Sequence, residues 1–222
     1  MKINNIWAVI PAYNEQSNIF GIIKRTKKYI DIVILVDDGS KDKTSDLGEK
    51  AGATVLKHVV NLGKGAALKT GCDFAVKKGA KFILVLDADA QHNPDDIPRF
   101  VEKLARYDIV FSYRKLSKKM PFILRIGNLF ISSIVRILYG INLIDTQCGF
   151  RAFSRDAYKK IRWNSSDYSM ESEMIARAGK QKLKYVQISI QTVYSDKYKG
   201  TTVVDGIRIV LNMLWWKLFN NK

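Results

Sequence analysis

Short apolar runs alternate with longer stretches of mixed polarity along the N-terminal part of the chain. The apolar runs predict β-strands at 6–10, 32–36, 54–59 and 81–86, and the stretches between them predict helices at 16–29, 43–51 and 66–78. Strands that alternate with helices form βαβ units. We therefore expect an α/β fold with a mainly parallel central sheet and helices on both faces. A further run at 184–190 is expected to extend the sheet.

Polar turns follow each of the four predicted strands. These turns are 11–15, 37–44, 61–71 and 87–92, and all of them contain Gly, Pro or clustered charge. In open α/β sheets, ligands bind beyond the carboxyl ends of the strands. The four turns are therefore expected to meet at one edge of the sheet and to form the functional site.

Two carboxylates, Asp87 and Asp89, come directly after the most apolar strand. On an extended backbone, side chains two residues apart leave the same face. Two carboxylates aimed at one point repel each other unless a cation lies between them. Mg²⁺ takes carboxylate oxygens and keeps open positions for substrate phosphates. A metal site is the favoured interpretation, and an acidic loop that only caps the next helix, as 93–96 is expected to do, is the alternative.

Two of the other turns contain residues suited to a nucleotide. Asp37 or Asp38, before the tight turn at Gly39, can accept hydrogen bonds from a base or a ribose. Lys64 lies between two glycines at a predicted helix start, and a helix N-terminus with a lysine is a natural phosphate site. The spacing is not that of a P-loop, and Leu68 occupies the third glycine position of a dinucleotide fingerprint.

The chain of 222 residues is strongly basic. Lys and Arg total 37 against 21 acidic residues, which gives a formal net charge of +16. Such an excess indicates a polyanionic partner: a nucleic acid, an anionic membrane surface or a phosphorylated ligand. Two distant cysteines, Cys72 and Cys148, are typical of a reducing compartment, so a cytoplasmic location is expected. The apolar run at 6–10 is too short for a signal peptide, and no transmembrane helix is predicted.

Two segments, 121–141 and 203–222, combine many apolar residues with a few cations. Arg125 and Arg136 would each cost at least about 2.5 kcal/mol at mid-bilayer, so a position in the membrane interface is favoured over spanning. Aromatic residues near 215 suit the headgroup level. The alternative is a pair of core or homodimer-interface helices. The expected organisation is a catalytic domain at 1–202, including the first segment, followed by an amphipathic helix at 203–222.

In combination, the motifs resemble a known family. "VIPAYNE", "VDDGS", "NLGKGAAL" and "DADAQHNPDDI" are similar to the nucleotide-sugar half of family-2 glycosyltransferases with the GT-A fold. "DTQCGFRAF" at 145–153 and "SMESEMIARA" at 169–178 resemble the polyprenyl-phosphate branch, the dolichyl-phosphate mannose and glucose synthases. The resemblance extends from Ile6 to about Lys199.

The resemblance implies roles for individual residues. A nucleotide-diphosphate sugar would contact Pro11, Ala12, Tyr13, Glu15, Asp38, Lys64, Asp87, Ala88, Asp89 and Gln91. Asp87, Asp89 and Gln91 would surround Mg²⁺ or Mn²⁺. Arg114 would match an arginine that contacts phosphate, although the family usually has Ser-Arg-Tyr where this chain has Ser-Tyr-Arg. Arg125 is a second candidate for the acceptor phosphate.

The implied reaction moves a hexose from the nucleotide to a polyprenyl (dolichyl) phosphate with inversion, at the cytoplasmic face of a membrane. A metal would neutralise the charge on the departing nucleoside diphosphate. A phosphate monoester, with a second pKa of about 6, is already mostly dianionic and needs no base. A sugar or protein hydroxyl needs a carboxylate base. For that alternative acceptor, Asp145, Glu171 and Glu173 are the candidate bases.

Three points stay open at this stage. "DTQCGF" favours a UDP-glucose-like donor, whereas the mannose synthases, which use GDP-mannose, share most of the other motifs. A nucleotidyltransferase also uses a sheet edge and a carboxylate-bound metal, but it does not account for "DTQCGFRAF". Nucleic-acid binding is disfavoured, because no standard module is present and acidic residues at the strand ends would repel phosphates.

Overall fold

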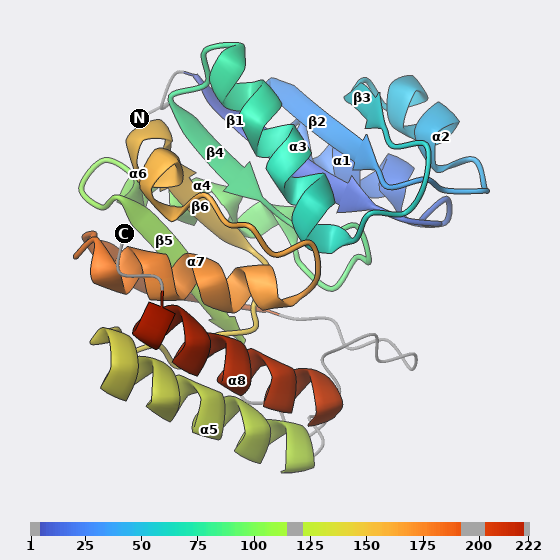
Figure 1. Cartoon of the computed structure of the whole chain (residues 1–222). Coiled ribbons are helices and arrows are strands. Elements are labelled where there is room, and N and C mark those ends of the chain that lie inside the picture. The colour runs from blue at the N-terminus through green and yellow to red at the C-terminus, as the bar shows by residue number, and fades with distance from the viewer. Residues whose placement is uncertain (1–4, 115–121, 192–202, 220–222) are drawn as a thin grey trace.

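A seven-stranded sheet forms the centre of the computed structural model, which describes residues 5–114, 122–191 and 203–219 (Figure 1). The strand order is β3-β2-β1-β4-β6-β5-β7. The strands are β1 (Ile6–Ala12), β2 (Ile32–Asp37), β3 (Thr54–Lys57), β4 (Phe82–Val85), β5 (Ile109–Arg114), β6 (Arg151–Ser154) and β7 (Tyr185–Ile190). Only β6 runs antiparallel to its neighbours β4 and β5, so the expected mainly parallel sheet is confirmed.

Helices cover both faces of the sheet, as the sequence predicts. They are α1 (Ile19–Thr26), α2 (Thr44–Lys50), α3 (Lys64–Lys77), α4 (Ile97–Lys103), α5 (Phe122–Tyr139), α6 (Arg155–Ile161), α7 (Ser169–Lys180) and α8 (Val203–Phe219), with a short 3₁₀ turn at Pro94–Asp96. Side chains of β1 alternate between two buried clusters. Val9 packs with the α3 and α7 side, whereas Ala8 and Ile10 pack with the α1 and α4 side. Burial on both faces explains the unbroken apolar runs.

The sequence pattern did not identify β5 or β6. The four residues of β6 include Arg151, a charged side chain that is only 2% exposed. A buried arginine interrupts the apolar pattern on which strand prediction depends. The third predicted strand also ends earlier than expected, at Lys57, because His58 turns toward Asp38.

Helices α5 and α8 lie side by side beyond α7, on the far side from the sheet (Figure 1). Tyr139 of α5 donates a hydrogen bond to the carbonyl oxygen of Met213 in α8 at 2.6 Å. Ile209 and Met213 of α8 join the buried cluster on the α3 side of the sheet. Helix α8 is therefore packed onto α5 and α7 largely through apolar contacts.

The outer surface of this helix pair is rich in exposed apolar side chains. They are Leu129, Phe130 and Ile137 from α5 and Leu211, Leu214, Trp215 and Leu218 from α8. Within the described ranges, none of the helices is both long and apolar enough to cross a membrane. Pro121 and residues 220–222, which belong to the two predicted amphipathic segments, lie outside the described residues, as does the side chain of Arg125.

Candidate active site

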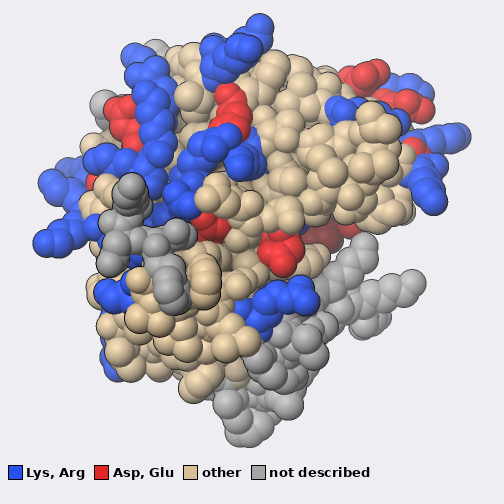
Figure 2. All heavy atoms as spheres, in the orientation of Figure 1, with Lys and Arg blue, Asp and Glu red and all other residues tan. Residues whose placement is uncertain are grey.

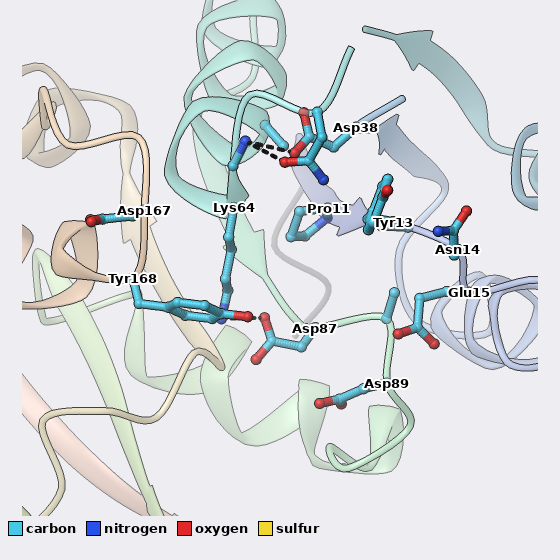
Figure 3. A pocket seen from close by; sticks show the side chains of 15 residues that line it. Pro11, Tyr13, Asn14, Glu15, Asp38, Lys64, Asp87, Asp89, Asp167 and Tyr168 are labelled. Atoms are coloured by element: carbon cyan, nitrogen blue, oxygen red, sulfur yellow. Dashed lines mark hydrogen bonds and ion pairs between the residues drawn. The ribbon is translucent and has the colours of Figure 1, made fainter. Parts of the chain in front are cut away.

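A cavity of about 560 Å³ opens at the carboxyl ends of β1, β2 and β4 (Figure 3). Its lining residues are Pro11, Ala12, Tyr13, Asn14, Glu15, Asp38, Asn61, Gly63, Lys64, Ala67, Asp87, Ala88, Asp89, Asp167 and Tyr168. Every residue assigned to the nucleotide sugar from the sequence lies in this lining except Gln91. The four polar turns therefore meet at one edge, as expected for parallel strands.

Several lining residues were not identified from the sequence. Asn14 and Asn61 lie within the quoted turns, so a reading of each whole turn would have included them. Asp167 and Tyr168 precede α7, and no local sequence motif identifies them as residues of the site. They reach the cavity only because the loop before α7 folds against the start of α3.

The two aspartates reach the cavity through a bend in the chain. Strand β4 ends at Val85, and Ala90 adopts a left-handed conformation with φ of +62°. The expected extended backbone at Asp87 and Asp89 is therefore wrong. The bend still directs both carboxylates into the cavity (Figure 3). A left-handed alanine costs about 1–2 kcal/mol, and such strain is commonly held at functional sites.

The backbone N–H of Gln91 donates to Asp89 Oδ1 at 3.0 Å and fixes that carboxylate. Burial and the neighbouring charge of Asp87 together raise the pKa of Asp89. The two carboxylates therefore repel each other across a shared space, which is the electrostatic setting that a cation relieves.

Lys64 supplies positive charge beside this pair. Its ammonium lies 2.7 Å from Asp87 Oδ1 (Figure 3). It also lies 2.9 Å from Glu171 Oε1. Burial disfavours the charged lysine, but the two carboxylates outweigh it and raise the pKa of Lys64. Burial likewise disfavours the Asp87 carboxylate, but Lys64, with smaller contributions from His92 and Arg151, outweighs it, so the pKa of Asp87 is lowered. Lys64 thus stabilises Asp87 in its ionised form.

The N-terminus of α3 is not open to a phosphate, contrary to the expectation from the glycine-lysine turn. The N–H groups of Gly65 and Ala66 both donate to the carbonyl oxygen of Ser166, at 2.7 and 3.2 Å. A Cβ at Gly63 or Gly65 would lie 2.4 Å from a backbone carbonyl of the 165–166 segment. The glycines therefore allow two loops to pack closely. Asn61, Gly63, Lys64 and Ala67 of this turn line the cavity.

Asp37 and Asp38, the two alternatives from the sequence, have different roles in the structure. Asp37 is fully buried and accepts from the N–H of Ser40 at 2.8 Å, so it closes the turn. Asp38 lines the cavity and accepts from His58, from the N–H of Leu62 at 2.9 Å and from the N–H of Gly63 at 2.8 Å. Asp38 thereby orients the loop that carries Lys64.

Arg114 and Asp145, both candidates from the sequence, pair with each other. The guanidinium Nε and Nη2 donate to the two carboxylate oxygens at 2.7 and 3.1 Å. Neither residue belongs to the cavity lining, and Asp145 is 5% exposed. Glu171 is equally buried and acts on the cavity through Lys64. The structure does not bring Arg114, Asp145 and Glu171 into direct contact with the cavity.

Buried Arg151 organises the segment "DTQCGF". It donates to the carbonyl oxygens of Cys148, Glu171 and Thr146 at 2.8–2.9 Å. It therefore ties this segment to the start of α7. Gly149 lies so close to the site that a Cβ there would be 2.5 Å from Asp87 Oδ2. These contacts explain why this segment, remote in sequence, contributes to the geometry around Asp87.

The side chains of the cavity that could bind a metal ion suit a hard divalent ion only in part. Asp87 and Asp89 offer carboxylate oxygens to an open cavity, which matches a metal that shares its coordination with phosphates. In the part of the chain that the structure describes, Nδ1 of buried His92 has no hydrogen-bond partner, and it lies 3.9 Å from Asp87 Oδ2. Among the described residues, no group of three or more His, Cys, Asp or Glu side chains could hold a metal by itself. The residues therefore fit an ion whose remaining ligands come from the substrate.

A mainly parallel α/β sheet with a carboxylate-lined cavity at its carboxyl edge is the arrangement in which open α/β proteins bind their ligands. Comparison with known proteins identifies the family. Residues 7–162 match the model described as Glycosyl transferase family 2, so the chain belongs to this family and is a glycosyltransferase.

Two curated relatives match nearly the whole chain. An uncharacterized protein of Methanocaldococcus jannaschii is 38% identical over 228 residues, covering 97% of this chain and 93% of the relative. The UDP-N-acetylglucosamine–dolichyl-phosphate N-acetylglucosaminyltransferase of Methanococcus voltae is 33% identical over 241 residues and covers 96% of each chain.

A solved structure shows the same fold. The glucosyl-3-phosphoglycerate synthase of Mycobacterium tuberculosis, in complex with Mn²⁺, UDP and glucosyl-3-phosphoglycerate, superposes with a TM-score of 0.73 at 20% identity. The match covers 96% of this chain and 79% of that chain. The GT-A fold expected from the motifs is confirmed.

Proposed function

We propose that this glycosyltransferase moves a sugar from a nucleotide-diphosphate donor to a polyprenyl phosphate at a membrane surface, with inversion at the anomeric carbon. One observation carries the proposal: the wall of the carboxylate cavity is linked to the helix pair that exposes apolar side chains. Arg208 of α8 lies 3.8 Å from Asp167, which lines the cavity. A lipid-borne acceptor anchored beside α5 and α8 would have its phosphate close to the donor.

The named relative supports the acceptor class. The Methanococcus voltae protein carries dolichyl phosphate as the acceptor in its name, and its length matches this chain throughout. The donor in the name of that protein is UDP-N-acetylglucosamine, so this nucleotide sugar joins UDP-glucose and GDP-mannose as a candidate donor for this chain. The sugar is therefore left to experiment.

Within this proposal, Pro11, Tyr13 and Asp38 form the wall for the nucleoside, and Lys64 faces the diphosphate. Asp87 and Asp89 would hold Mg²⁺ or Mn²⁺, with Gln91 fixing Asp89 through its backbone N–H. When bound, the ion would neutralise negative charge on the departing nucleoside diphosphate. Lys64 keeps Asp87 ionised, so the carboxylate is ready for a cation before the donor arrives.

One assay tests donor and acceptor together. The protein is incubated with Mg²⁺ or Mn²⁺, a polyprenyl phosphate, and radiolabelled UDP-glucose, GDP-mannose or UDP-N-acetylglucosamine in turn. We expect one donor to give label in the organic phase, and excess chelator to abolish it. Label transferred only to a water-soluble sugar or protein would instead support a hydroxyl acceptor.

Glu171→Gln distinguishes the two acceptor chemistries. The amide oxygen of Gln can still accept from Lys64, but it cannot remove a proton. Because a phosphate acceptor is already ionised, we expect the variant to keep at least about a tenth of wild-type turnover, whereas loss of a general base costs about 10²- to 10⁴-fold. The measurement is kcat at saturating donor, with donor affinity as the control. A collapse in kcat with intact donor affinity would contradict base-free attack.

Membrane association is expected to depend on the exposed face of α5 and α8. The triple variant Ile137→Ser, Leu211→Ser, Leu218→Ser removes side chains that are 77%, 61% and 67% exposed. Burying one such side chain is worth about 1.5–3 kcal/mol, so vesicle binding should weaken at least about tenfold. Val59→Ser, at a 99% exposed site away from these helices, is the control. If the triple variant and the control float equally with vesicles, membrane association through α5 and α8 is wrong.

A further inference from the structure

Two partly exposed tyrosines lie at opposite ends of the carboxylate cavity. Tyr13 comes from the turn after β1 and Tyr168 from the loop before α7, and they are 43% and 47% exposed. Figure 3 shows Lys64 and Asp87 between the two rings. In the proposed function the nucleoside lies at Tyr13 and the diphosphate at Lys64 and Asp87. The sugar, which is the remaining part of the donor, is therefore expected at the Tyr168 end.

The loop that carries Tyr168 is held in place from two sides. The carbonyl oxygen of Ser166 accepts from the N–H of Gly65 at 2.7 Å. Buried Glu173 accepts from the N–H and the hydroxyl of Ser165 at 2.9 and 2.7 Å. A loop that is ordered before its ligand arrives loses little conformational freedom on binding. The exposed side chains of this loop are therefore suited to ligand contact.

The Tyr168 ring lies beside the charged centre of the cavity. The Lys64 ammonium is 5.7 Å from the centroid of this ring and 2.7 Å from Asp87 Oδ1. An aromatic ring offers an apolar face to the C–H groups of a sugar, and the tyrosine hydroxyl can exchange hydrogen bonds with the hydroxyl groups of that sugar. Tyr168 thus provides both kinds of contact next to the expected position of the diphosphate.

Asp167 adds a hydrogen-bond acceptor beside this ring. Its Oδ1 atom accepts from the N–H of Ser169 at 2.9 Å. Its Oδ2 atom lies 3.8 Å from Arg208 Nη1, and the two side chains are 46% and 61% exposed, so this ion pair is a weak surface contact. The Oδ2 atom of Asp167 therefore keeps the capacity to accept a hydrogen bond from a ligand in the cavity.

The charge at this end of the cavity favours a sugar over a phosphate group. Figure 2 shows acidic side chains at the middle of this face, where the N-terminal end of α7 lies in Figure 1. Lys64 is already paired with Asp87 and Glu171. The Asp167 carboxylate repels a phosphate group, whereas it accepts hydrogen bonds from uncharged hydroxyl groups.

We propose that Asp167 and Tyr168 form the subsite for the sugar that is transferred. The Tyr168 ring packs against one face of the sugar, and Asp167 Oδ2 accepts from one of its hydroxyl groups. This subsite rests on the proposed function, since it requires that the cavity holds a nucleotide sugar. Both residues lie outside residues 7–162, so they belong to a part of the cavity that the family match does not cover.

The test compares the binding of a nucleoside diphosphate with the binding of the corresponding nucleotide sugar. The full-length protein with Mn²⁺ is titrated in a calorimeter with UDP, GDP, UDP-glucose, GDP-mannose and UDP-N-acetylglucosamine. Tyr168→Ala removes the ring, and Tyr168→Phe keeps it. Asp167→Asn keeps an oxygen for the N–H of Ser169 and removes the second carboxylate oxygen. Tyr13→Ala, at the nucleoside end of the same cavity, is the matched control.

For the base that the wild type binds, we expect Tyr168→Ala to weaken binding of the nucleotide sugar about tenfold and to leave binding of the nucleoside diphosphate within about twofold. Asp167→Asn should weaken only the nucleotide sugar, about fivefold, and Tyr168→Phe should stay within about threefold of the wild type. Tyr13→Ala should weaken both ligands by the same factor. An equal effect of Tyr168→Ala on the two ligands, or no effect on either, would overturn the proposal.

Because these titrations contain no acceptor, they separate the sugar subsite from the rest of the proposed function. If Tyr168→Ala shows the sugar-selective loss but the wild type transfers no sugar to a polyprenyl phosphate, only the acceptor in the proposed function is wrong. If the wild type binds none of the nucleoside diphosphates or nucleotide sugars, the donor in the proposed function is wrong, and the sugar subsite is wrong with it.

Discussion

Asp89→Asn is expected to reduce turnover about 10²- to 10³-fold while leaving the protein at least as stable as the wild type. The loss of turnover is expected because, in the proposed function, Asp89 is one of the two carboxylates that would hold the metal ion at the donor diphosphate. The stability follows from electrostatics. Burial and Asp87 raise the pKa of Asp89, so its ionised form opposes folding at neutral pH. An uncharged Asn at the same position removes this repulsion.

The direction in which the free energy of unfolding changes with pH tests this explanation. An acid whose pKa is raised on folding destabilises the protein above its folded pKa, and this effect disappears in acid where the carboxyl is protonated in both states. In urea unfolding at pH 7, Asp89→Asn should therefore have a larger free energy of unfolding than the wild type, and this difference should vanish near pH 3. Asp31→Asn, at an exposed bend, is the control. Normal turnover in Asp89→Asn would show that the metal hypothesis is wrong. A large loss of stability would make Asp89 a structural residue.

Lys64→Met is expected to lower the free energy of unfolding by about 3 kcal/mol at pH 7, because it leaves Asp87 and Glu171 without the ammonium between them. Methionine keeps most of the side-chain length and cannot donate a hydrogen bond. Lys77→Met, at an exposed position of the same helix, is the control. The measurement is urea unfolding of both variants and the wild type across pH.

The wild type and Lys64→Met should respond to acid in opposite directions. In the wild type the pKa of Asp87 is lowered. The contribution of Asp87 to the free energy of unfolding is therefore present above the unfolded pKa of about 3.9 and is lost as the pH falls. In Lys64→Met, burial without the ammonium raises that pKa, and the variant gains stability as the pH falls. The two curves should converge in acid.

Mg²⁺ or Mn²⁺ should also restore part of the stability of Lys64→Met at pH 7, because a divalent ion at Asp87 and Asp89 replaces the lost positive charge. This readout does not depend on turnover. No effect of either ion on the unfolding curve, together with an unchanged stability of Lys64→Met, would show that the Lys64 contacts contribute little.

Much of the cavity lining could be predicted from the sequence, because its residues follow parallel strands whose carboxyl ends share one edge of the sheet. Pro11, Asp38 and Asp87 each come directly after an apolar run, and parallel strands bring their carboxyl ends together. The period of the apolar residues thus determined both the sheet and the position of the cavity.

The contacts that set charge and orientation could not be predicted in the same way. Lys64 and Glu171 are 107 residues apart in sequence, and the pairing of Arg114 with Asp145 spans 31 residues. The carbonyl of Ser166, which closes the start of α3, likewise comes from a distant loop. None of these pairings leaves a periodic pattern, because each depends on where loops pack after the sheet has formed.

By itself, the sequence determined that the chain is an α/β protein with acidic, glycine-rich turns at the ends of its parallel strands, since apolar periodicity and turn composition are local properties. Only the tertiary structure decided which of those groups share the cavity, which are already paired, and which helices expose apolar side chains beside it. Ion pairing and burial are properties of three-dimensional packing, so they are settled only when distant segments come into contact.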